Sequence, residues 1–237
     1  MIEQHGPHRL YVGRCEELLE LLDDASVDAV VTDPPYGMRG GGAAVCGREG
    51  NPLDLKWDHT MPLEYLPEMA RVMRPGAAAI VFVEQRHTGT MWNAMEASGL
   101  GPRSCFYWVK PNPVPNPRKS FMSGVEVAIF ARKPGPVLCW NGGGTSLNYW
   151  HGPAVHGVLP VELQGKLTPK PVQLIKHLIA AITDPGMTVL DLFLGSGTTL
   201  VGCHDLGRIG IGSELSPVHA AVARSRIGEA MAQLSLF

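Results

Sequence analysis

Short apolar runs with the character of buried strands alternate with helical segments along most of this chain. Residues 27–32, 77–83 and 187–193 are such runs, whereas residues 171–182 carry one apolar stripe at helical spacing. This alternation is typical of an α/β protein with a mainly parallel sheet and helices on both of its faces. A chain of 237 residues is long enough to bury one sizeable core, so we expect a single domain over residues 1–237.

The first of these strands leads directly into Asp33-Pro34-Pro35-Tyr36. Open α/β sheets bind their ligands at the carboxyl ends of the strands, so these four residues are candidates for a catalytic site. The Asp33 carboxylate is a hydrogen-bond acceptor, the two prolines restrict the backbone, and the tyrosine ring offers a stacking surface. This combination suits a planar base that carries an exocyclic amine.

The strand at 187–193 ends in a second candidate site, a turn that contains Gly195 and Gly197. Glycine lets the backbone approach a ligand closely, and the helix after the turn offers free backbone N–H groups. Glu214 ends another predicted strand about 20 residues later, the position from which nucleotide-binding folds contact a ribose. The turn has neither a third glycine in the dinucleotide pattern nor a lysine. A ligand with a ribose and no phosphates, such as S-adenosylmethionine, therefore fits better than NAD or a P-loop nucleotide.

Composition sets limits on other classes of function. A net charge of -2 neither predicts nor excludes a nucleic-acid partner. The five cysteines form no Cys-x-x-Cys pair and the histidines no His-x-x-x-His pair, so we expect reduced thiols and no metal site. No run is long and apolar enough to span a bilayer, and the first residues lack the pattern of a signal peptide. We therefore expect a cytoplasmic protein without membrane contact.

Together these motifs resemble those of the amino-methylating DNA methyltransferases. Residues 33–37, Asp-Pro-Pro-Tyr-Gly, resemble the catalytic signature of that family, and residues 191–199 resemble its cofactor signature. Residues 168–171 resemble the family's Thr-x-Lys-Pro segment, which packs beside the methionine end of the cofactor. Since the catalytic motif precedes the cofactor motif, the resemblance is to the permuted beta class. It implies a mixed seven-stranded Rossmann-like sheet and a homodimer as a candidate assembly.

The resemblance implies methyl transfer from S-adenosylmethionine to the N6 amine of an adenine that is flipped out of double-stranded DNA. Asp33 and the Pro34 carbonyl would accept hydrogen bonds from the amine, and Tyr36 would stack on the flipped base. The same signature admits an N4-cytosine or an RNA methyltransferase, and a catalytically silent DNA-binding module is an alternative of another class. The cofactor contacts that the resemblance implies are Asp33, Lys170, Pro171, Asp191, Phe193, Gly195, Ser196, Gly197, Thr198 and Glu214.

Contacts to DNA are expected from less regular parts of the chain. Residues 134–165 show little periodicity and are predicted to form a small target-recognition excursion. The glycine-rich stretch 37–57 is predicted to be a mobile loop that closes over a ligand or, as an equal alternative, a disordered insertion. The resemblance also implies a bacterial or phage-encoded enzyme that associates with the nucleoid. The candidate DNA-binding residues are Arg39, Arg118, Lys119, Asn141 and His151.

One position departs from the family pattern. The pair Gly13-Arg14 stands after the first predicted strand, where the family commonly has Gly-Asp and the acid contacts the adenine of the cofactor. We therefore expect this chain to recognise that adenine more weakly or through other groups.

Overall fold

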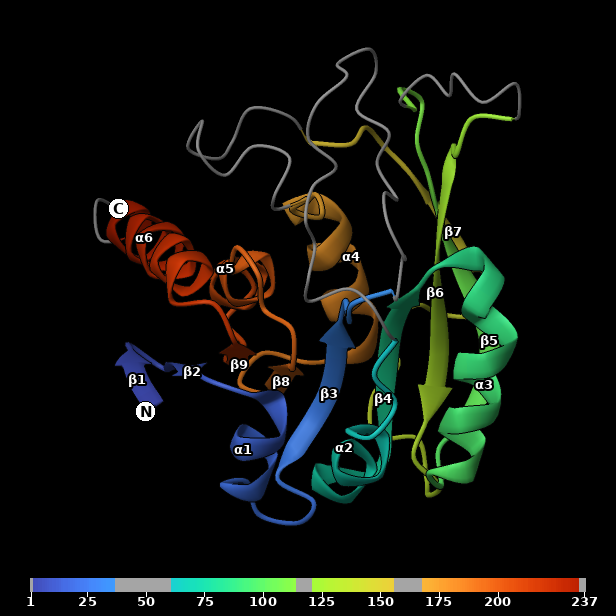
Figure 1. Cartoon of the computed structure of the whole chain (residues 1–237), viewed down its shortest axis with the longest axis horizontal. Coiled ribbons are helices and arrows are strands. Elements are labelled where there is room, and N and C mark those ends of the chain that lie inside the picture. The colour runs from blue at the N-terminus through green and yellow to red at the C-terminus, as the bar shows by residue number, and fades with distance from the viewer. Residues whose placement is uncertain (1, 37–60, 114–120, 156–167, 235–237) are drawn as a thin grey trace.

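The computed structural model describes residues 2–36, 61–113, 121–155 and 168–234. Its strands are β1 (Ile2–His5), β2 (His8–Val12), β3 (Val27–Thr32), β4 (Met73–Val83), β5 (Gly101–Val109), β6 (Val125–Arg132), β7 (Tyr149–His151), β8 (Thr188–Asp191) and β9 (Ile209–Glu214). They form one nine-stranded sheet in the order β1-β2-β9-β8-β3-β4-β6-β5-β7 (Figure 1). Strands β2, β9, β8, β3 and β4 run parallel to one another, whereas β6 is antiparallel to both of its neighbours.

Helices cover both faces of this sheet (Figure 1). One face packs against α1 (Cys15–Glu20), α2 (Leu66–Val72) and α3 (Thr88–Ala97), which follows the short 3-10 helix η1 (Gln85–His87). The other face packs against α4 (Val172–Ile182), α5 (Thr198–Asp205) and α6 (Pro217–Leu234). The sheet is therefore the middle layer of three, as the alternating sequence pattern predicts.

The predicted fold class is confirmed, but the predicted number of strands is wrong. The seven strands from β2 to β5 in sheet order match the expected sheet, and a short strand extends each edge. At one edge β1 pairs antiparallel with β2, and at the other β7 pairs parallel with β5. Both edge strands are exposed or half-buried and only four and three residues long, so they lack the apolar pattern that identifies a buried strand.

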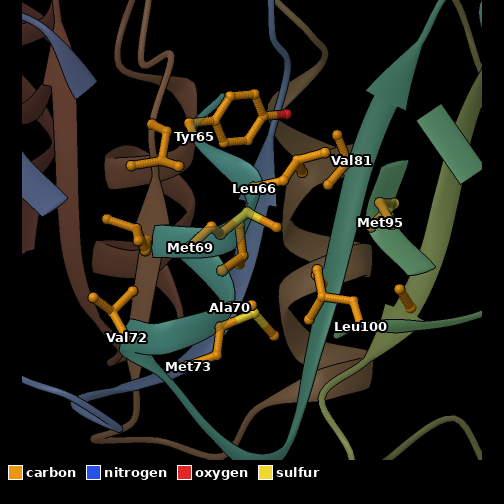
Figure 2. Packing of buried hydrophobic residues seen from close by; sticks show 14 of the residues in the cluster. Tyr65, Leu66, Met69, Ala70, Val72, Met73, Val81, Met95 and Leu100 are labelled. Atoms are coloured by element: carbon orange, nitrogen blue, oxygen red, sulfur yellow. The ribbon is translucent and has the colours of Figure 1, made fainter. Parts of the chain in front are cut away.

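The central strands are buried on both faces, which explains their uninterrupted apolar sequences. In β3, Val30 packs on the α1–α3 side, whereas Ala29 packs on the α4 side, because successive side chains of a strand point to opposite faces. On the first side, Leu66 and Met69 of α2 pack beside Val81 of β4 (Figure 2). The apolar stripe of α4 fills the second side.

The order of the strands reverses direction between β3 and β8. From β8 the chain passes through α5 to β9, which lies on the β1 side of β8 in the sheet. From β3 it passes through α2 to β4, which lies on the β7 side of β3, and α2 and α5 cover opposite faces of the sheet. The two strands are themselves parallel neighbours, with Ala29 opposite Val189. In open α/β sheets such a switch point is where ligands bind at the carboxyl ends of the strands. The fold thus brings residues 33–36 and the turn at 195–197 to one edge of the sheet.

Part of the segment predicted to recognise the DNA target lies at the amino ends of the strands, opposite the carboxyl ends that carry the two motifs. After β6 the chain runs along the amino end of β4, where the N–H of Leu138 donates to the Gly76 carbonyl at 3.2 Å. The side-chain amide of Asn141 donates to the carbonyls of Ala180 at 3.1 Å and Thr183 at 2.9 Å, at the carboxyl end of α4. This position does not support the predicted DNA contact of Asn141. Its amide hydrogens bond to carbonyls of the protein itself, and the residue lies at the end of the strands opposite to Asp33.

Replacing Gly76 tests how firmly this segment is held. Gly76 has φ +78°, and a Cβ on it would lie 1.6 Å from the backbone oxygen of Pro136. We expect Gly76→Ala to lower the free energy of unfolding by about 3 kcal/mol or more, because left-handed strain and a backbone clash add. Urea unfolding followed by circular dichroism measures this loss.

Gly99→Ala is the matched control for that variant. Gly99 has φ +82°, but no described atom lies within 4 Å of a Cβ at this position. It should therefore show the backbone strain alone, about 1 kcal/mol. Equal losses in the two variants would contradict the close contact between Gly76 and Pro136.

Candidate functional site

The two predicted motifs begin side by side at the carboxyl edge of the sheet. Thr32 ends β3 and Asp191 ends β8, and the Thr32 hydroxyl donates a hydrogen bond of 2.8 Å to the Asp191 carboxylate. The same hydroxyl accepts the N–H of Leu192 at 3.1 Å. Because both side chains are buried, this pair joins the start of the Asp33 motif to the start of the glycine turn. Thr32 was not predicted from the sequence, where a polar residue at the end of an apolar run is its only signal.

The glycine turn adopts a backbone that depends on its glycines. Gly195 and Gly197 have φ of +55° and +82°, in the left-handed region. A Cβ on Gly197 would lie 2.9 Å from the Cα of Ala223 in α6, so the turn and the last helix pack closely. The N–H of Gly195 donates to Glu214 Oε2 at 2.8 Å and ties the turn to the end of β9.

Glu214 is a partly enclosed acceptor beside this turn. Its Oε1 accepts the N–H of Ser216 at 2.8 Å and lies 3.5 Å from Nδ1 of His219. Burial raises the pKa of the Glu214 carboxyl, and the hydrogen bonds from Ser216 and Gly195 oppose that rise. A carboxylate oxygen has a second lone pair, so Glu214 can accept further hydrogen bonds from the hydroxyls of a ligand.

An arginine from the last helix clamps the turn. Arg226 Nη1 donates to the Ser196 carbonyl at 2.8 Å, to the Ser196 hydroxyl at 2.6 Å and to the Thr198 hydroxyl at 3.0 Å. Burial lowers the pKa of Arg226. The side chains of Ser196 and Thr198, both predicted cofactor residues, are therefore engaged within the protein, and their backbone groups are what they offer a ligand. Arg226 was not predicted, because its partners lie in a distant part of the chain.

Asp191 is enclosed by donors from its own loop. Besides Thr32, its carboxylate accepts the Thr199 hydroxyl at 2.6 Å and the N–H of Phe193 at 3.1 Å. The side chain is only 4% exposed, and burial raises its pKa to about 6 despite these hydrogen bonds. We retain Asp191 in the predicted cofactor site as a residue that shapes the turn from within.

The residues after β3 form a charged and aromatic cluster with Lys170. The Tyr36 hydroxyl donates to Asp33 Oδ1, the Lys170 ammonium donates to Asp33 Oδ2, and Lys170 Nζ lies 3.4 Å from the Tyr36 oxygen. Burial and the Asp33 carboxylate raise the pKa of Tyr36 well above its usual value, so its hydroxyl stays a donor. Lys170 precedes Pro171, the N-cap of α4. Its hydrogen bond with Asp33 joins the Thr-x-Lys-Pro segment to the Asp33 motif, although the two residues are 137 positions apart in sequence.

Two further residues extend this cluster. Glu126 at the start of β6 lies 3.2 Å from Lys170 Nζ through its Oε2, and its Oε1 accepts Lys110 Nζ at 2.7 Å. Burial alone would lower the pKa of Lys170, but the carboxylates of Asp33 and Glu126 outweigh it and hold that pKa well above its usual value. Neither Glu126 nor Lys110 was predicted. The signal for Glu126 was its position as the one charged residue in the apolar run 125–131.

The remaining predicted residues have different positions. Pro34 is buried, and Phe193 is half-buried with its ring 5.1 Å from that of Tyr65. His151 is exposed at the end of β7, on the same edge of the sheet as Asp33. The predictions outside the described residues concern Arg39, Arg118, Lys119, residues 37–57 and residues 156–165.

Arg14 occupies the position at which the family pattern has an acidic residue. Its guanidinium pairs with Glu16 at 3.1 Å, and its side chain is 65% exposed. Val12 lies opposite Glu214 in the sheet, so Gly13 and Arg14 are next to the predicted ribose site. A ligand at this end of the site would therefore meet a cation and backbone groups from this position.

The described ranges contain no cluster of three or more histidine, cysteine, aspartate or glutamate side chains arranged to hold a metal ion. In the same part of the chain, no helix is long and apolar enough to cross a membrane. The described cysteines, Cys15, Cys105, Cys139 and Cys203, are free thiols.

The sequence of this chain is similar to those of known DNA methylases. The sequence model of a DNA methylase family, N6/N4, matches residues 27–155 and 145–225. The type II methyltransferase M2.DpnII of Streptococcus pneumoniae is 28% identical over 232 residues, which cover 89% of this chain and 86% of that protein. The type II methyltransferase M.HpaI of Haemophilus parainfluenzae is 24% identical over 240 residues, 92% of this chain and 74% of that one.

Solved structures show the same fold at low sequence identity. M1.HpyAVI, in a complex with S-adenosylmethionine, superposes with a TM-score of 0.70 at 24% identity, over 92% of this chain and 98% of that one. The PvuII DNA methyltransferase, described as cytosine-N4-specific, has a TM-score of 0.70 at 19% identity, over 92% and 85% of the two chains. The architecture is therefore that of the S-adenosylmethionine-dependent methyltransferase fold.

The raised pKa of Asp191 predicts a pH dependence of stability. Folding raises the pKa of Asp191 from 3.8 to about 6, so the folded protein binds a proton more tightly than the unfolded chain does. This proton binding stabilises the folded state fully below pH 4, and the stabilisation is lost as pH rises through 6. Relative to Asp191→Asn, the wild type should lose on the order of 3 kcal/mol of unfolding free energy between pH 4 and pH 7. Urea unfolding of both proteins at each pH measures the difference.

The exposed carboxylate of Asp23 provides the control for this titration. Asp23→Asn should follow the wild type across the same pH range, because this side chain is exposed to water in the folded protein as it is in the unfolded chain. A difference between Asp191→Asn and the wild type that stays constant from pH 4 to pH 7 would contradict the raised pKa.

Proposed function

Because the chain belongs to the N6/N4 DNA methylase family, we propose that it transfers a methyl group from S-adenosylmethionine to the N6 amine of adenine in double-stranded DNA. Methylation of DNA follows from the family, and the choice of adenine N6 is our proposal. The observation that supports methyl transfer at this edge is the pairing of β3 with β8, whose ends are joined by the 2.8 Å hydrogen bond from Thr32 to Asp191. Asp33, an acceptor for an amine, and Glu214, an acceptor for ribose hydroxyls, consequently share one edge of the sheet.

The residues around the turn fit S-adenosylmethionine. Glu214 on β9 offers carboxylate oxygens to ribose hydroxyls beside the turn, and the turn carries no lysine to bind phosphates, so a ligand with a ribose and without phosphates fits this site. Glu214 would hold the ribose hydroxyls, the backbone at Gly195 and Gly197 would lie against the ligand, and Lys170 would border its methionine end. When bound, S-adenosylmethionine supplies an electrophilic methyl group.

The amine of adenine is a weak nucleophile because its lone pair is shared with the ring. Asp33 and the Pro34 carbonyl would accept its two hydrogens, and this favours a tetrahedral nitrogen with a free lone pair. Tyr36 would stack on the flipped base and hold it in line with the methyl group. The methylated amine is acidic as a cation, so its proton can pass to Asp33 or to water without a strong base.

N4-cytosine methylation is the second candidate. The chain shares its fold with the PvuII enzyme, which is described as cytosine-N4-specific, and the cytosine amine presents the same two hydrogens. Asp33 at the first position of the catalytic motif favours adenine through the resemblance. The two candidates differ in the shape of the base and not in the chemistry required of Asp33.

The proposal includes DNA bound at the carboxyl edge of the sheet. His151 is exposed at this edge, and Arg39, Arg118 and Lys119, which lie outside the described residues, remain proposed contacts to DNA. A homodimer and a cytoplasmic, nucleoid-associated location remain parts of the same proposal.

Mass analysis of nucleosides separates the candidate functions. Duplex DNA and, in parallel, RNA are incubated with the protein and S-adenosylmethionine and then digested to nucleosides. N6-methyladenine from the duplex supports the proposal, and N4-methylcytosine would replace it with the second candidate. A methylated base found only in RNA, or no product at all, would reject both.

Asp33→Ala should lower the rate of methyl transfer by about 10²–10³-fold, because the variant loses an acceptor that acts on the reacting amine. Transfer of a radiolabelled methyl group to duplex DNA measures the rate. Asp23→Ala removes an exposed carboxylate before β3 and should keep the wild-type rate. Unchanged transfer by Asp33→Ala would remove this residue from the mechanism.

Two substitutions of Tyr36 distinguish stacking from hydrogen bonding. Tyr36→Ala removes the ring and should weaken productive base binding by about 1–3 kcal/mol, seen as a five- to 150-fold loss of kcat/KM. Tyr36→Phe keeps the ring and loses only the hydroxyl that donates to Asp33, so its loss should be smaller. The two values come from steady-state methylation with varied DNA, and losses of equal size would argue against stacking.

A further inference from the structure

Glu126 carries a buried acceptor that points at the centre of the proposed site. Its Oε1 accepts Lys110 Nζ at 2.7 Å, whereas its Oε2 lies 3.2 Å from Lys170 Nζ. Although the side chain as a whole is 26% exposed, Oε2 is buried, and in the part of the chain that the structure describes it accepts no aligned hydrogen bond. A vacant carboxylate oxygen therefore stands next to the Lys170 ammonium.

Lys170 cannot exchange a lost partner for water. Its side chain is 9% exposed, and its Nζ lies 4.9 Å from the centre of the Phe82 ring and 5.7 Å from that of Tyr36. It donates a hydrogen bond to Asp33 Oδ2 and a longer one of 3.4 Å to the Tyr36 oxygen, so Asp33 is its one charged hydrogen-bond partner among the described residues. Because leaving a buried ammonium without a carboxylate is strongly unfavourable, Lys170 needs such a partner throughout a catalytic cycle.

The proposed reaction makes a competing demand on Asp33. Both of its oxygens already have partners, since Oδ1 accepts the Tyr36 hydroxyl and Oδ2 accepts Lys170. Each oxygen keeps a second lone pair that can accept a hydrogen of the target amine, but a third donor shares the same negative charge and thereby weakens the contacts with Tyr36 and Lys170. Lys170 is the partner with a second carboxylate within reach.

We propose that Glu126 is a positioning residue that takes the hydrogen bond of Lys170 while Asp33 engages the target amine. The proposal rests on the proposed function, because it supposes that Asp33 accepts an amine. Lys110 holds Glu126 in place through the other oxygen, so Oε2 stays directed at Lys170. Asp33, Lys170, Glu126 and Lys110 thus form a row of alternating charges in which one proton donor moves between two acceptors.

The ionisation of Glu126 agrees with this role. Burial would raise the pKa of its carboxyl, but Lys170 and Lys110 outweigh burial and hold the pKa below its usual value. Glu126 is therefore a carboxylate at neutral pH and can receive the ammonium without first losing a proton.

Steady-state kinetics of Glu126→Gln test the proposal. We expect kcat to fall at least about ten-fold, while the KM values for DNA and for S-adenosylmethionine change less than about three-fold, because the loss affects Asp33 after both ligands are bound. Asp205→Asn is the matched control: it removes the carboxylate from the Lys176 ion pair of 2.8 Å, at the far end of α5, and should keep the wild-type kcat.

The double variant Lys110→Met with Glu126→Gln separates this role from a structural one. If Glu126 only neutralised Lys110, removing both groups would restore the rate, since no unpaired charge would remain at that position. We expect the double variant to stay as slow as Glu126→Gln. Recovery of kcat in the double variant, or an unchanged kcat in Glu126→Gln, would overturn the proposal.

A titration of Lys170 gives a readout that does not need methyl transfer. The pKa is followed by NMR of lysine labelled at Cε, with Lys170→Met to assign the signal. We expect adding Glu126→Gln to Asp33→Asn to lower the Lys170 pKa by about two units or more, because the ammonium then has no carboxylate left. If the addition leaves the pKa unchanged, Glu126 does not hold the ammonium and the proposal is wrong.

The two arms also separate this proposal from the proposed function. A wild-type protein that methylates no base in DNA would reject the proposed function, and with it the transfer role of Glu126. The lysine titration would still decide whether Glu126 receives the ammonium when Asp33 is lost.

Discussion

The candidate site depends on the lateral pairing of β3 with β8. The residues that end these strands, Thr32 and Asp191, are 159 positions apart in sequence, yet a buried hydrogen bond joins them. A slip of one residue in this pairing would move the ends past each other by about 3.3 Å and reverse the face to which each side chain points. The buried hydrogen bond between Thr32 and Asp191 opposes such a slip, because Asp191 would lose the Thr32 hydroxyl, one of the donors that compensate for its burial. Register and chemistry are thus set by the same contact.

Local sequence was informative wherever a structural element is defined by its own residues. The buried strands, the stripe of α4 and the two turns at their ends follow from apolar runs, helical periodicity and glycine or proline positions, and these identified most of the sheet. Pairing at the edges could not be predicted in this way, since β1 and β7 have no buried face of their own. Asn141 lies in an irregular polar stretch that resembles a surface loop, but its amide binds the end of α4. Arg226 and Glu126 matter through partners that only the folded chain brings near.

The buried charges of the site are a poor source of folding stability, so we attribute them to the reaction that the site carries out. Replacing a buried ion pair by apolar side chains is often neutral or stabilising, so a row of four alternating charges is not required to hold this core together. Phe82 and Trp108 pack beside the two lysines and limit their access to water, which strengthens each attraction. The same low polarity makes Asp33 sensitive to every change in the position of its neighbours.

Arg226 gives the order of synthesis a functional meaning. The residues proposed to hold the base are made first, the glycine turn follows much later, and the guanidinium that donates to the Ser196 carbonyl comes after both. A nascent chain without α6 has the turn but lacks the group that secures it. The proposed cofactor turn is therefore fully secured only after α6 has packed against it, although the turn's own residues precede that helix in the sequence.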